Sequence, residues 1–274
     1  MSSINIVDTT LRDGEQAAGV VFNKEDKKCI SILLDQVGVY EIEAGTPAMG
    51  SGECEALAEV LALNLTARVS TWNRANIKDI QASLDCGSRH LHISLPVSDI
   101  QIHYKLQKSR SWVIDKLQEA VIFARDAGAS VTIGAEDASR ADFNFLVEYA
   151  GLARELGAER LRFADTVGVL DPFKSYYIVQ KLIIESGIDV EFHAHNDFAM
   201  AVANTLAGVK AGAQFASTTV LGLGERAGNC PLEMIINVFD QFMPQAVSVN
   251  HNGLGSLVSY VTSATAGVAS TVFA

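Results

Sequence analysis

Cysteine pairs, long apolar runs and positive charge are all scarce in this chain. Only four cysteines occur, Cys29, Cys54, Cys86 and Cys230, and none forms a CxxC pair. Such a pattern is typical of reduced, mostly buried thiols in a cytoplasmic protein. The N-terminus shows no basic segment followed by an apolar one, which excludes a recognisable secretion signal. No apolar run reaches the roughly 18 residues that a membrane-spanning helix requires. These absences favour a cytoplasmic protein without a membrane partner.

The shortage of positive charge further limits the classes of partner that the chain can bind. The 274 residues include 21 lysines and arginines against 32 aspartates and glutamates, so the formal net charge is −11. This balance argues against a nucleic acid or an anionic membrane surface as partner. An anionic substrate would need a local cluster of arginines. Hydrophobic residues, in contrast, make up 49% of the chain, which suffices for one α/β barrel or two smaller domains.

The chain repeats a unit of one strand followed by one helix. The first helix is predicted at Lys24–Val37, where apolar residues share one face and Asn23 can cap the N-terminus. Glycines suited to a left-handed helix C-terminus follow six predicted helices, at Gly38, Gly87, Gly128, Gly157, Gly187 and Gly212. Eight apolar or β-branched runs are predicted as strands, at residues 4–7, 40–43, 67–71, 90–95, 130–134, 160–163, 190–194 and 215–220.

Eight strands alternating with helices predict an α/β protein with a closed (β/α)8 TIM barrel. The competing fold, a doubly wound open sheet, usually carries a glycine-rich phosphate turn after its first strand, and residues 8–13 do not form one. No low-complexity linker interrupts residues 1–243, where we expect the catalytic barrel domain. Residues 244–274 are expected to form a short C-terminal extension, with a turn at 250–253, that begins a truncated subdomain.

Two histidines at the end of the seventh predicted strand give the strongest chemical signal. His193 and His195 are two positions apart, a spacing that puts both side chains on one face of a strand. Asp13 follows the first strand, and only the eighth strand separates strands 1 and 7 in a closed barrel. Two histidines and a carboxylate are typical of a metal site with open positions, to which Asn229 could add an amide oxygen. The alternative is two imidazoles satisfied by neighbouring carboxylates.

Three motifs carry a family resemblance. Residues 11–16 (LRDGEQ), with Lys27 further on, resemble the N-terminal signature of the isopropylmalate synthase and homocitrate synthase family. Residues 193–197 (HAHND) resemble its second signature, and the glycine-rich loop at 222–229 resembles its acyl-CoA-associated loop. The similarity covers about residues 4–240. Three further segments look closest to the nitrogen-fixation type of homocitrate synthase, at residues 94–99, 135–142 and 160–168.

The resemblance implies a metal-dependent TIM barrel that condenses acetyl-CoA, as co-substrate, with a 2-oxo acid in a Claisen-type reaction. The 2-oxo acid would be 2-oxoglutarate and the product homocitrate. Asp13, His193, His195 and Asn229 would hold a divalent metal, which is zinc, manganese or magnesium. That metal would act as a Lewis acid on the oxygen of the 2-oxo acid.

The resemblance also implies roles for residues around the metal. Arg12 would place a fixed positive charge beside the reacting oxygen or the enolate of acetyl-CoA, and Glu136 would be the base or would orient it. The alternative for these polar groups is satisfaction within the fold or in a surface ion pair. Substrate is expected to contact Gln16, Glu43, Arg74, His92 and Thr166, and acetyl-CoA to contact Gly222, Gly224 and Arg226.

Two positions depart from the family pattern. Lysine-pathway homocitrate synthases have an arginine on strand 5 for the distal carboxylate of 2-oxoglutarate, whereas Thr132 occupies that place here. We therefore expect Arg74, after strand 3, to supply the cation. Ala199 stands where the second signature normally has glycine, and we expect it on a helix near its start.

Family members continue beyond the barrel into a region that contributes a catalytic histidine and tyrosine to the active site of a partner subunit. The chain stops near where that region would begin, so we expect a homodimer or association with a separate C-terminal subunit. Three alternatives stay open. The chain could be an isopropylmalate or citramalate synthase with another 2-oxo acid, a carbon–carbon lyase, or a non-catalytic subunit that needs a second polypeptide.

Overall fold

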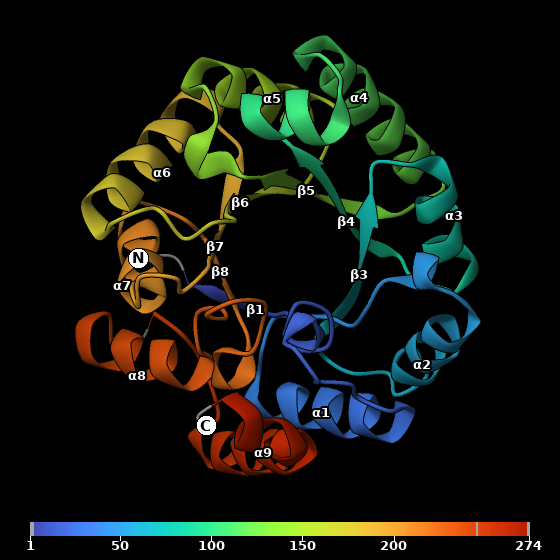
Figure 1. The fold of residues 1–274 in the computed structure, drawn as a ribbon, viewed down its shortest axis with the longest axis vertical. Helices are drawn as coiled ribbons and strands as arrows, with labels where there is room; N and C mark the ends of the chain where they lie inside the picture. Colours follow the sequence, from blue (N-terminus) through green and yellow to red (C-terminus); the bar gives the residue numbers. More distant parts are fainter. Residues whose placement is uncertain (1–2, 245, 273–274) are drawn as a thin grey trace.

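Eight parallel strands close into a barrel, with helices around its outside (Figure 1). The computed structural model describes residues 3–244 and 246–272. The strands are β1 (Asn5–Asp8), β2 (Glu41–Glu43), β3 (Arg68–Arg74), β4 (His90–Pro96), β5 (Ser130–Glu136), β6 (Arg160–Asp165), β7 (Asp189–Ala194) and β8 (Phe215–Thr218). The predicted TIM barrel is confirmed, and every predicted strand overlaps an observed one.

The longer helices are α1 (Lys24–Val37), α2 (Ser51–Leu61), α3 (Ile77–Asp85), α4 (Arg110–Asp126), α5 (Phe143–Glu155), α6 (Pro172–Ser186), α7 (Ala201–Lys210), α8 (Leu232–Phe242) and α9 (His251–Val272). Short helices occur in the connections, at η1 (Gly14–Gln16), η2 (Pro47–Met49), η3 (Gln101–Leu106), η4 (Ala138–Arg140) and η5 (Val220–Gly222). Each of these five short helices follows a strand, so they lie where a TIM barrel builds its functional mouth.

Pairing of the first strand with the last one closes the barrel. β1 pairs with β8 along its length, from Asn5 opposite Phe215 to Asp8 opposite Thr218, and its other edge pairs with β2. β8 therefore separates β1 from β7 in the ring of strands. Loops that follow β1, β7 and β8 are therefore neighbours at one mouth of the barrel, as the predicted metal site requires.

Helix α1 shows how local sequence sets the helix ends. The Asn23 side chain accepts a hydrogen bond from the Asp26 backbone N–H, and the Asp26 side chain accepts one from the Asn23 N–H. Gly38 ends the helix with a φ of 91°, a left-handed conformation that glycine adopts without steric cost. Both predicted ends are confirmed. The other five glycines predicted at helix C-termini also have positive φ.

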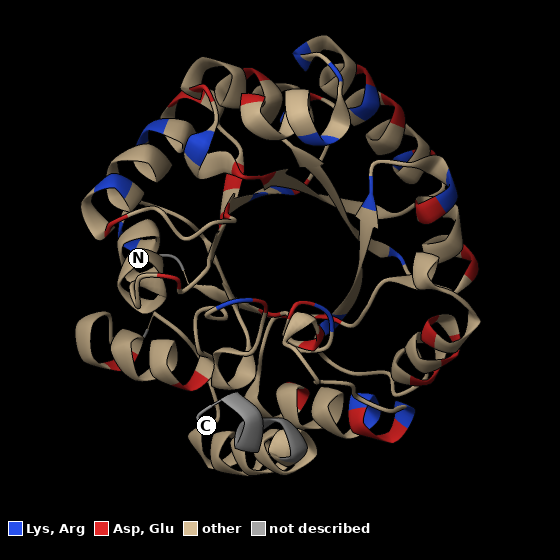
Figure 2. Cartoon of the chain, in the orientation of Figure 1, with Lys and Arg blue, Asp and Glu red and all other residues tan. Residues whose placement is uncertain are grey.

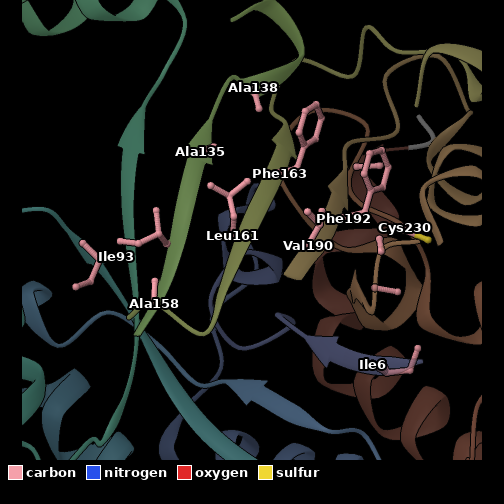
Figure 3. Packing of buried hydrophobic residues seen from close by; sticks show 14 of the residues in the cluster. Ile6, Ile93, Ala135, Ala138, Ala158, Leu161, Phe163, Val190, Phe192 and Cys230 are labelled. Atoms are coloured by element: carbon pink, nitrogen blue, oxygen red, sulfur yellow. The ribbon is translucent and has the colours of Figure 1, made fainter. Parts of the chain in front are cut away.

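Apolar side chains fill the layer between the barrel and its helices. Leu161 and Phe163 on β6 and Val190 and Phe192 on β7 are fully buried, and Figure 3 shows these residues together. The rings of Phe163 and Phe192 stack with their centroids 5.7 Å apart. Phe192 also packs against Gly208 of α7, where a β-carbon would lie 2.8 Å from the ring. This layer fixes β6 and β7 from the outside.

The intervening positions of the same strands carry buried charges instead. Arg160 binds Glu41 and Glu191, with an N···O distance of 2.8 Å in each pair. Arg162 binds Glu191 and lies 2.8 Å from Glu43. No member of this group is more than 2% exposed. Figure 2 shows acidic and basic segments around the central opening as well as on the outer helices. Buried charges persist only with partners, so the barrel interior is an ion network.

The C-terminal helix α9 packs along α1 (Figure 1). Leu257 and Val261 of α9 are fully buried. The Tyr260 hydroxyl donates a hydrogen bond to the Asp26 carboxylate at 3.0 Å. α9 is 22 residues long. Neither it nor another helix in the described part of the chain combines the length and apolar character that a membrane crossing requires.

The turn predicted at residues 250–253 is wrong, because α9 begins at His251. Asn250 stands directly before the helix, and its side chain accepts a hydrogen bond from the Asn252 N–H at 3.1 Å. An asparagine in this position caps a helix as readily as it makes a turn. Apolar contact with α1 decides between the two, and that contact is not visible in the local sequence.

Two of the four cysteines are paired. Cys54 of α2 and Cys86, which follows α3, form a disulfide with their Cα atoms 5.5 Å apart. Cys230 is buried and Cys29 is partly buried. The prediction of four reduced, mostly buried thiols is therefore wrong for Cys54 and Cys86. The two residues are 32 positions apart, and the fold alone brings them together.

Asp8, the last residue of β1, is a buried carboxyl group with a raised pKa. Its Oδ1 accepts a hydrogen bond from the Thr10 N–H at 2.9 Å, whereas Oδ2 has no hydrogen-bond partner. Burial raises the pKa of Asp8 from 3.8 to about 7, against the hydrogen bonds from Thr10 that lower it. The folded chain thus keeps this proton at pH values where the unfolded chain has lost it. The stability due to Asp8 is complete below pH 3.8 and is lost as the pH rises toward 7.

We therefore predict that the stability difference between the Asp8→Asn variant and the parent chain grows with pH. Because asparagine does not titrate, this position of the variant does not lose stability with rising pH, whereas the parent loses unfolding free energy as Asp8 ionises. The difference in unfolding free energy should shift in favour of the variant by about 2–3 kcal/mol between pH 5 and pH 8. Urea unfolding at both pH values measures it. An equal difference at the two pH values would contradict the raised pKa.

Candidate metal centre and substrate pocket

Three side chains converge at the mouth of the barrel. Asp13 lies in the turn after β1, whereas His193 and His195 lie at the end of β7 and just beyond it. His193 Nε2 is 3.5 Å from Asp13 Oδ2 and 3.4 Å from His195 Nε2. Ligand atoms of all three residues lie within 4.8 Å of one another, and the three residues are buried. The predicted convergence of the two motifs is what the structure shows.

Hydrogen bonds determine which atoms of this cluster are free. Ser217 Oγ on β8 is 2.8 Å from His193 Nδ1, so His193 presents Nε2 to the cluster. The Asn229 amide nitrogen donates to Asp13 Oδ1 at 3.1 Å. His195 Nδ1 and Asn229 Oδ1 are buried without a hydrogen-bond partner. Asp13 therefore does not satisfy every buried polar atom of the cluster, and a ligand can take up the remaining lone pairs.

The glycine-rich loop after β8 holds Asn229 in place. Gly222 and Gly224 have φ values of 67° and 156°, which disfavour other residues. A β-carbon on Gly224 would overlap the Asn229 amide nitrogen, and one on Gly222 would lie 3.1 Å from the Asn229 carbonyl oxygen. The amide also donates to the Leu223 carbonyl at 2.8 Å. The glycines thus let the backbone wrap closely around Asn229 and keep its amide beside Asp13.

Burial gives the cluster the protonation states of a metal centre. It lowers the pKa of His193 to about 3, although Asp13 acts in the opposite direction, and it lowers the pKa of His195 as well. Both imidazoles are therefore neutral at neutral pH and have lone pairs to donate. Burial alone would raise the pKa of Asp13, but Arg12 and the two histidines lower it to about 2. One carboxylate and two neutral imidazoles fit a divalent metal.

The cluster forms one wall of a cavity of about 300 Å³. This volume is at the small end of ligand pockets and suits a small organic acid. Five residues expected around the substrate or the reacting atoms also line the cavity, namely Arg12, Gln16, His92, Glu136 and Thr166. Two of them follow β1, His92 lies within β4, Glu136 ends β5 and Thr166 follows β6, so the barrel brings them together from distant parts of the sequence.

Glu43, buried at the end of β2, lies behind this lining and orients two of its members. Its carboxylate accepts hydrogen bonds from Arg12 Nε at 2.5 Å and from His92 Nδ1 at 2.7 Å. Burial would raise the pKa of Glu43, but Arg12, Arg162 and His92 lower it well below its ordinary value. Burial also lowers the pKa of His92 to about 4. Because a carboxylate only accepts, the neutral His92 carries its proton on Nδ1 and leaves Nε2 without a partner.

Thr166, which follows β6, and Glu136, the last residue of β5, both line the cavity. The Thr166 hydroxyl accepts a hydrogen bond from the Asp137 N–H at 2.8 Å, so its own O–H is available to donate. Glu136 Oε1 binds the Lys105 ammonium at 2.6 Å. The cavity wall therefore offers one hydroxyl donor and one carboxylate held by a lysine.

Two predicted arginines point away from the cavity. Arg74 donates two hydrogen bonds to Asp79, at 2.6 and 3.0 Å, and lines a neighbouring cavity instead. Arg226 binds the Asp197 carboxylate at 2.8 and 3.0 Å and the Thr166 carbonyl at 2.6 Å. The loop glycines are also absent from the cavity lining. The sequence places both arginines after strands, at the barrel mouth, but it does not show that nearby aspartates hold their side chains away from the cavity.

Several lining residues were not identified from the sequence. Arg162 is the most important, since it brings a buried cation to the cavity wall. A signal was present, because Arg160 and Arg162 alternate within a strand whose two faces are both buried. Charged residues at such positions indicate an interior ion network rather than solvent contact. The full set of missed lining residues is Trp72, Ser94, Lys105, Gly134, Arg162, Ala164 and Glu225.

Ala199 lies in the turn before α7, not within the helix as expected. Its φ of 57° is left-handed. This conformation costs a residue with a β-carbon roughly 1 kcal/mol and costs glycine nothing. The preference of the second signature for glycine thus has a backbone explanation.

The fold and the cluster together define a TIM barrel with a candidate metal centre at its mouth. The chain belongs to the HMGL-like family, whose model matches residues 3–258. The family resemblance seen in the sequence is confirmed. Relatives named as homocitrate synthases place the chain among acyltransferase-type enzymes.

Three relatives show the extent of the similarity. The chain is 49% identical over 258 residues to 2-isopropylmalate synthase 2 of Caldanaerobacter subterraneus. This match covers 94% of the chain and 67% of the relative. It is 46% identical to homocitrate synthase subunit alpha of Clostridium pasteurianum, covering 89% of the chain and 91% of the relative. It is 52% identical to homocitrate synthase 1 of Nostoc sp., and this match covers 86% of the chain and 63% of the relative.

Solved structures agree on the fold. The HMG-CoA lyase of Bacillus subtilis superposes with a TM-score of 0.84 over 96% of this chain and 94% of that chain. Its sequence identity is 18%, so the likeness concerns the barrel alone.

Proposed function

We propose that the chain condenses acetyl-CoA with 2-oxoglutarate to form homocitrate in the cytoplasm, at a divalent metal held by Asp13, His193, His195 and Asn229. The observation that carries this proposal is the buried cluster of two neutral imidazoles and one carboxylate beside a small cavity. Membership of the HMGL-like family supports an acetyl-CoA-dependent condensation with a 2-oxo acid. Identities of 46% and 52% to homocitrate synthases favour 2-oxoglutarate.

The reaction requires four changes of bonding. A base removes a proton from the methyl group of acetyl-CoA, and the electron pair of that carbon forms a bond to the keto carbon of the 2-oxo acid. The keto oxygen takes up a proton and becomes a hydroxyl group. Water then cleaves the thioester and releases the thiol of coenzyme A. A bound divalent metal supplies Lewis acidity toward the keto oxygen.

Residues of the cavity supply the other contributions. The Arg12 guanidinium, fixed by Glu43 and 2.9 Å from Asp13, would stabilise negative charge at the reacting oxygen or at the enolate. The free O–H of Thr166 would bind the carboxylate next to the keto group. Glu136 would remove the methyl proton or orient the group that does, since it is the carboxylate at the cavity wall held by Lys105.

The side chain of Asn229 lies beside the cluster. Its nitrogen donates to Asp13 and to the Leu223 carbonyl, and its oxygen is the buried atom without a partner. That oxygen is the atom of this side chain with lone pairs free for a metal. Two imidazoles favour zinc or manganese in affinity, while magnesium competes through its abundance.

The loop of Gly222, Gly224 and Arg226 is proposed as the contact for the phosphate-bearing part of acetyl-CoA. We also propose that the working enzyme contains a second polypeptide, as a homodimer or as a separate C-terminal subunit. The relative from Clostridium pasteurianum is named as a subunit, and the chain covers 91% of it.

Release of thiol from acetyl-CoA, measured over a panel of 2-oxo acids, tests the proposal. With Mn²⁺ present, we expect kcat/KM for 2-oxoglutarate to exceed that for 2-oxoisovalerate and pyruvate by at least about 10-fold. A chelator should abolish the signal. Preference for 2-oxoisovalerate would instead identify an isopropylmalate-type synthase, as the 49% identical relative suggests. Turnover by the purified chain alone would dismiss the non-catalytic alternative.

A further inference from the structure

Arg162 on β6 is a buried arginine whose hydrogen-bonding capacity is only partly used. It lines the cavity and is 2% exposed. Its Nε donates to Glu191, on the neighbouring strand β7. Its Nη1 is 2.8 Å from Glu43 Oε2. Yet Nη1 lacks the alignment of a hydrogen bond, and both Nη1 and Nη2 are buried without a hydrogen-bond partner. Such groups are costly unless a ligand satisfies them.

Small residues leave space in front of this guanidinium. Gly134 of β5 stands opposite Arg162 in the strand register. Ala164 is the next residue of β6 on the same side of the strand, and both small residues line the cavity. A β-carbon at Gly134 would overlap His92 Nε2 and would lie 3.0 Å from Ser94 Oγ. The absence of a side chain at Gly134 therefore keeps open the space between β4 and β6.

The other cations that line the cavity are already engaged by carboxylates. Arg12 is engaged by Glu43 and Asp13, and the Lys105 ammonium binds Glu136. His92 presents a lone pair at Nε2, because its proton is on the nitrogen that faces Glu43. Among the described residues that line the cavity, Arg162 is thus the arginine with buried N–H groups awaiting an acceptor.

We infer that Arg162 binds the distal carboxylate of the 2-oxo acid and selects dicarboxylic over monocarboxylic substrates. The inference rests on the proposed function and replaces Arg74 in the role expected from the sequence. Two parallel N–H groups of a guanidinium match the two oxygens of a carboxylate. A monocarboxylic 2-oxo acid would leave these donors buried and unpaired, which is how polar pockets reject analogues that lack a group.

The rival explanation is that Arg162 only neutralises Glu191 and Glu43. Arg160 provides a matched control, because it lies two residues earlier on β6, binds Glu191 at 2.8 Å and is 1% exposed. It differs in being absent from the cavity lining. Replacing either arginine by lysine keeps the charge inside the barrel but removes the planar fork. Only the Arg162 variant should then change the choice of substrate.

Equilibrium binding to the Mn²⁺-loaded chain tests the inference without requiring turnover. Calorimetric titrations would compare 2-oxoglutarate with 2-oxobutyrate, which has the same keto-acid head and no distal carboxylate. The parent chain should bind 2-oxoglutarate about 100-fold more tightly, and Arg162→Lys should lower that ratio by at least about 10-fold. The affinity of Arg162→Lys for 2-oxobutyrate should differ from that of the parent chain by less than about threefold. Arg160→Lys should preserve the ratio, and thermal unfolding confirms that each variant is folded.

The outcomes separate this inference from the proposed function. If the parent chain binds neither acid in the presence of Mn²⁺, the proposed function itself fails. Suppose that the parent prefers 2-oxoglutarate. If Arg162→Lys keeps that preference, or lowers the affinity for both acids by the same factor, Arg162 is only a counter-ion and the inference is overturned. Loss of the preference in Arg74→Gln rather than in Arg162→Lys would return the role to Arg74.

Discussion

Replacing His193 or His195 by alanine is expected to abolish tight binding of a divalent metal while leaving the barrel folded. Each variant removes one of the two imidazoles that we propose as metal ligands, and leaves the other imidazole with the Asp13 carboxylate and the Asn229 amide. Bound manganese after dialysis should fall from about one ion per chain to about a tenth of that. Elemental analysis measures this ratio, and circular dichroism checks the fold.

His103→Ala is the matched control, because His103 is exposed and its ring contacts only the Asp99 carbonyl at 2.9 Å among its described hydrogen bonds. It should keep full metal content. Thiol release should fall by at least about 10³ in the two site variants, since the Lewis acid contributes several kcal/mol to the barrier. Unchanged manganese content in both His193→Ala and His195→Ala would end the metal assignment.

Arg12 is expected to have the second largest effect, on turnover rather than on metal content. Its guanidinium lies over Trp72, 5.8 Å from the ring centroid, and is fixed by Glu43 and Asp13. We propose that this charge lies beside the reacting oxygen, and a charge held so rigidly needs no reorganisation during the reaction. Arg12→Gln should therefore lower kcat for thiol release by about 10²–10³. Arg12→Lys should recover part of this loss, because the charge returns without the fork.

The control for Arg12 is Arg110→Gln, at an arginine outside the cavity that binds Asp99 with an N···O distance of 2.6 Å. It should leave kcat unchanged within about twofold. A loss in Arg12→Gln that came with loss of bound manganese would indicate that Arg12 supports Asp13 structurally. A kcat within about threefold of the parent would remove Arg12 from the reaction.

Local sequence was sufficient for the barrel and for the centre of the site. Hydrophobic runs, the Asn23 cap and the glycines after helices are short-range signals, and the structure confirms them. The spacing of His193 and His195 on one strand is equally local. Closure of eight strands then brings Asp13 beside them, because the order of strands around a TIM barrel follows the order in the chain.

What the sequence could not reveal depends on partners distant in the chain. Arg74 ends β3 at the mouth, as expected, but Asp79 five residues later takes its guanidinium and leaves the side chain 66% exposed. Arg162 appears in the sequence as one charge in an apolar strand. Its position at the cavity depends on Glu191 and on the absence of a side chain at Gly134.

The disulfide between Cys54 and Cys86 follows the same rule. The contact requires the ends of two neighbouring helices, and neither residue has a cysteine close by in the sequence. Composition alone favoured reduced thiols. Tertiary placement overrides that expectation, as it does for the start of α9 at His251.

The central claim is that Asp13, His193 and His195 bind the metal at which a 2-oxo acid is activated. Crystals of the chain grown with Mn²⁺ and 2-oxoglutarate test it most directly, through the anomalous scattering of manganese. The account predicts a peak within about 2.0–2.3 Å of a ligand atom from each of the three residues, with the keto acid bound to it and its distal carboxylate at Arg162. A fully loaded crystal with its manganese peak elsewhere, and none between these three residues, would contradict the account.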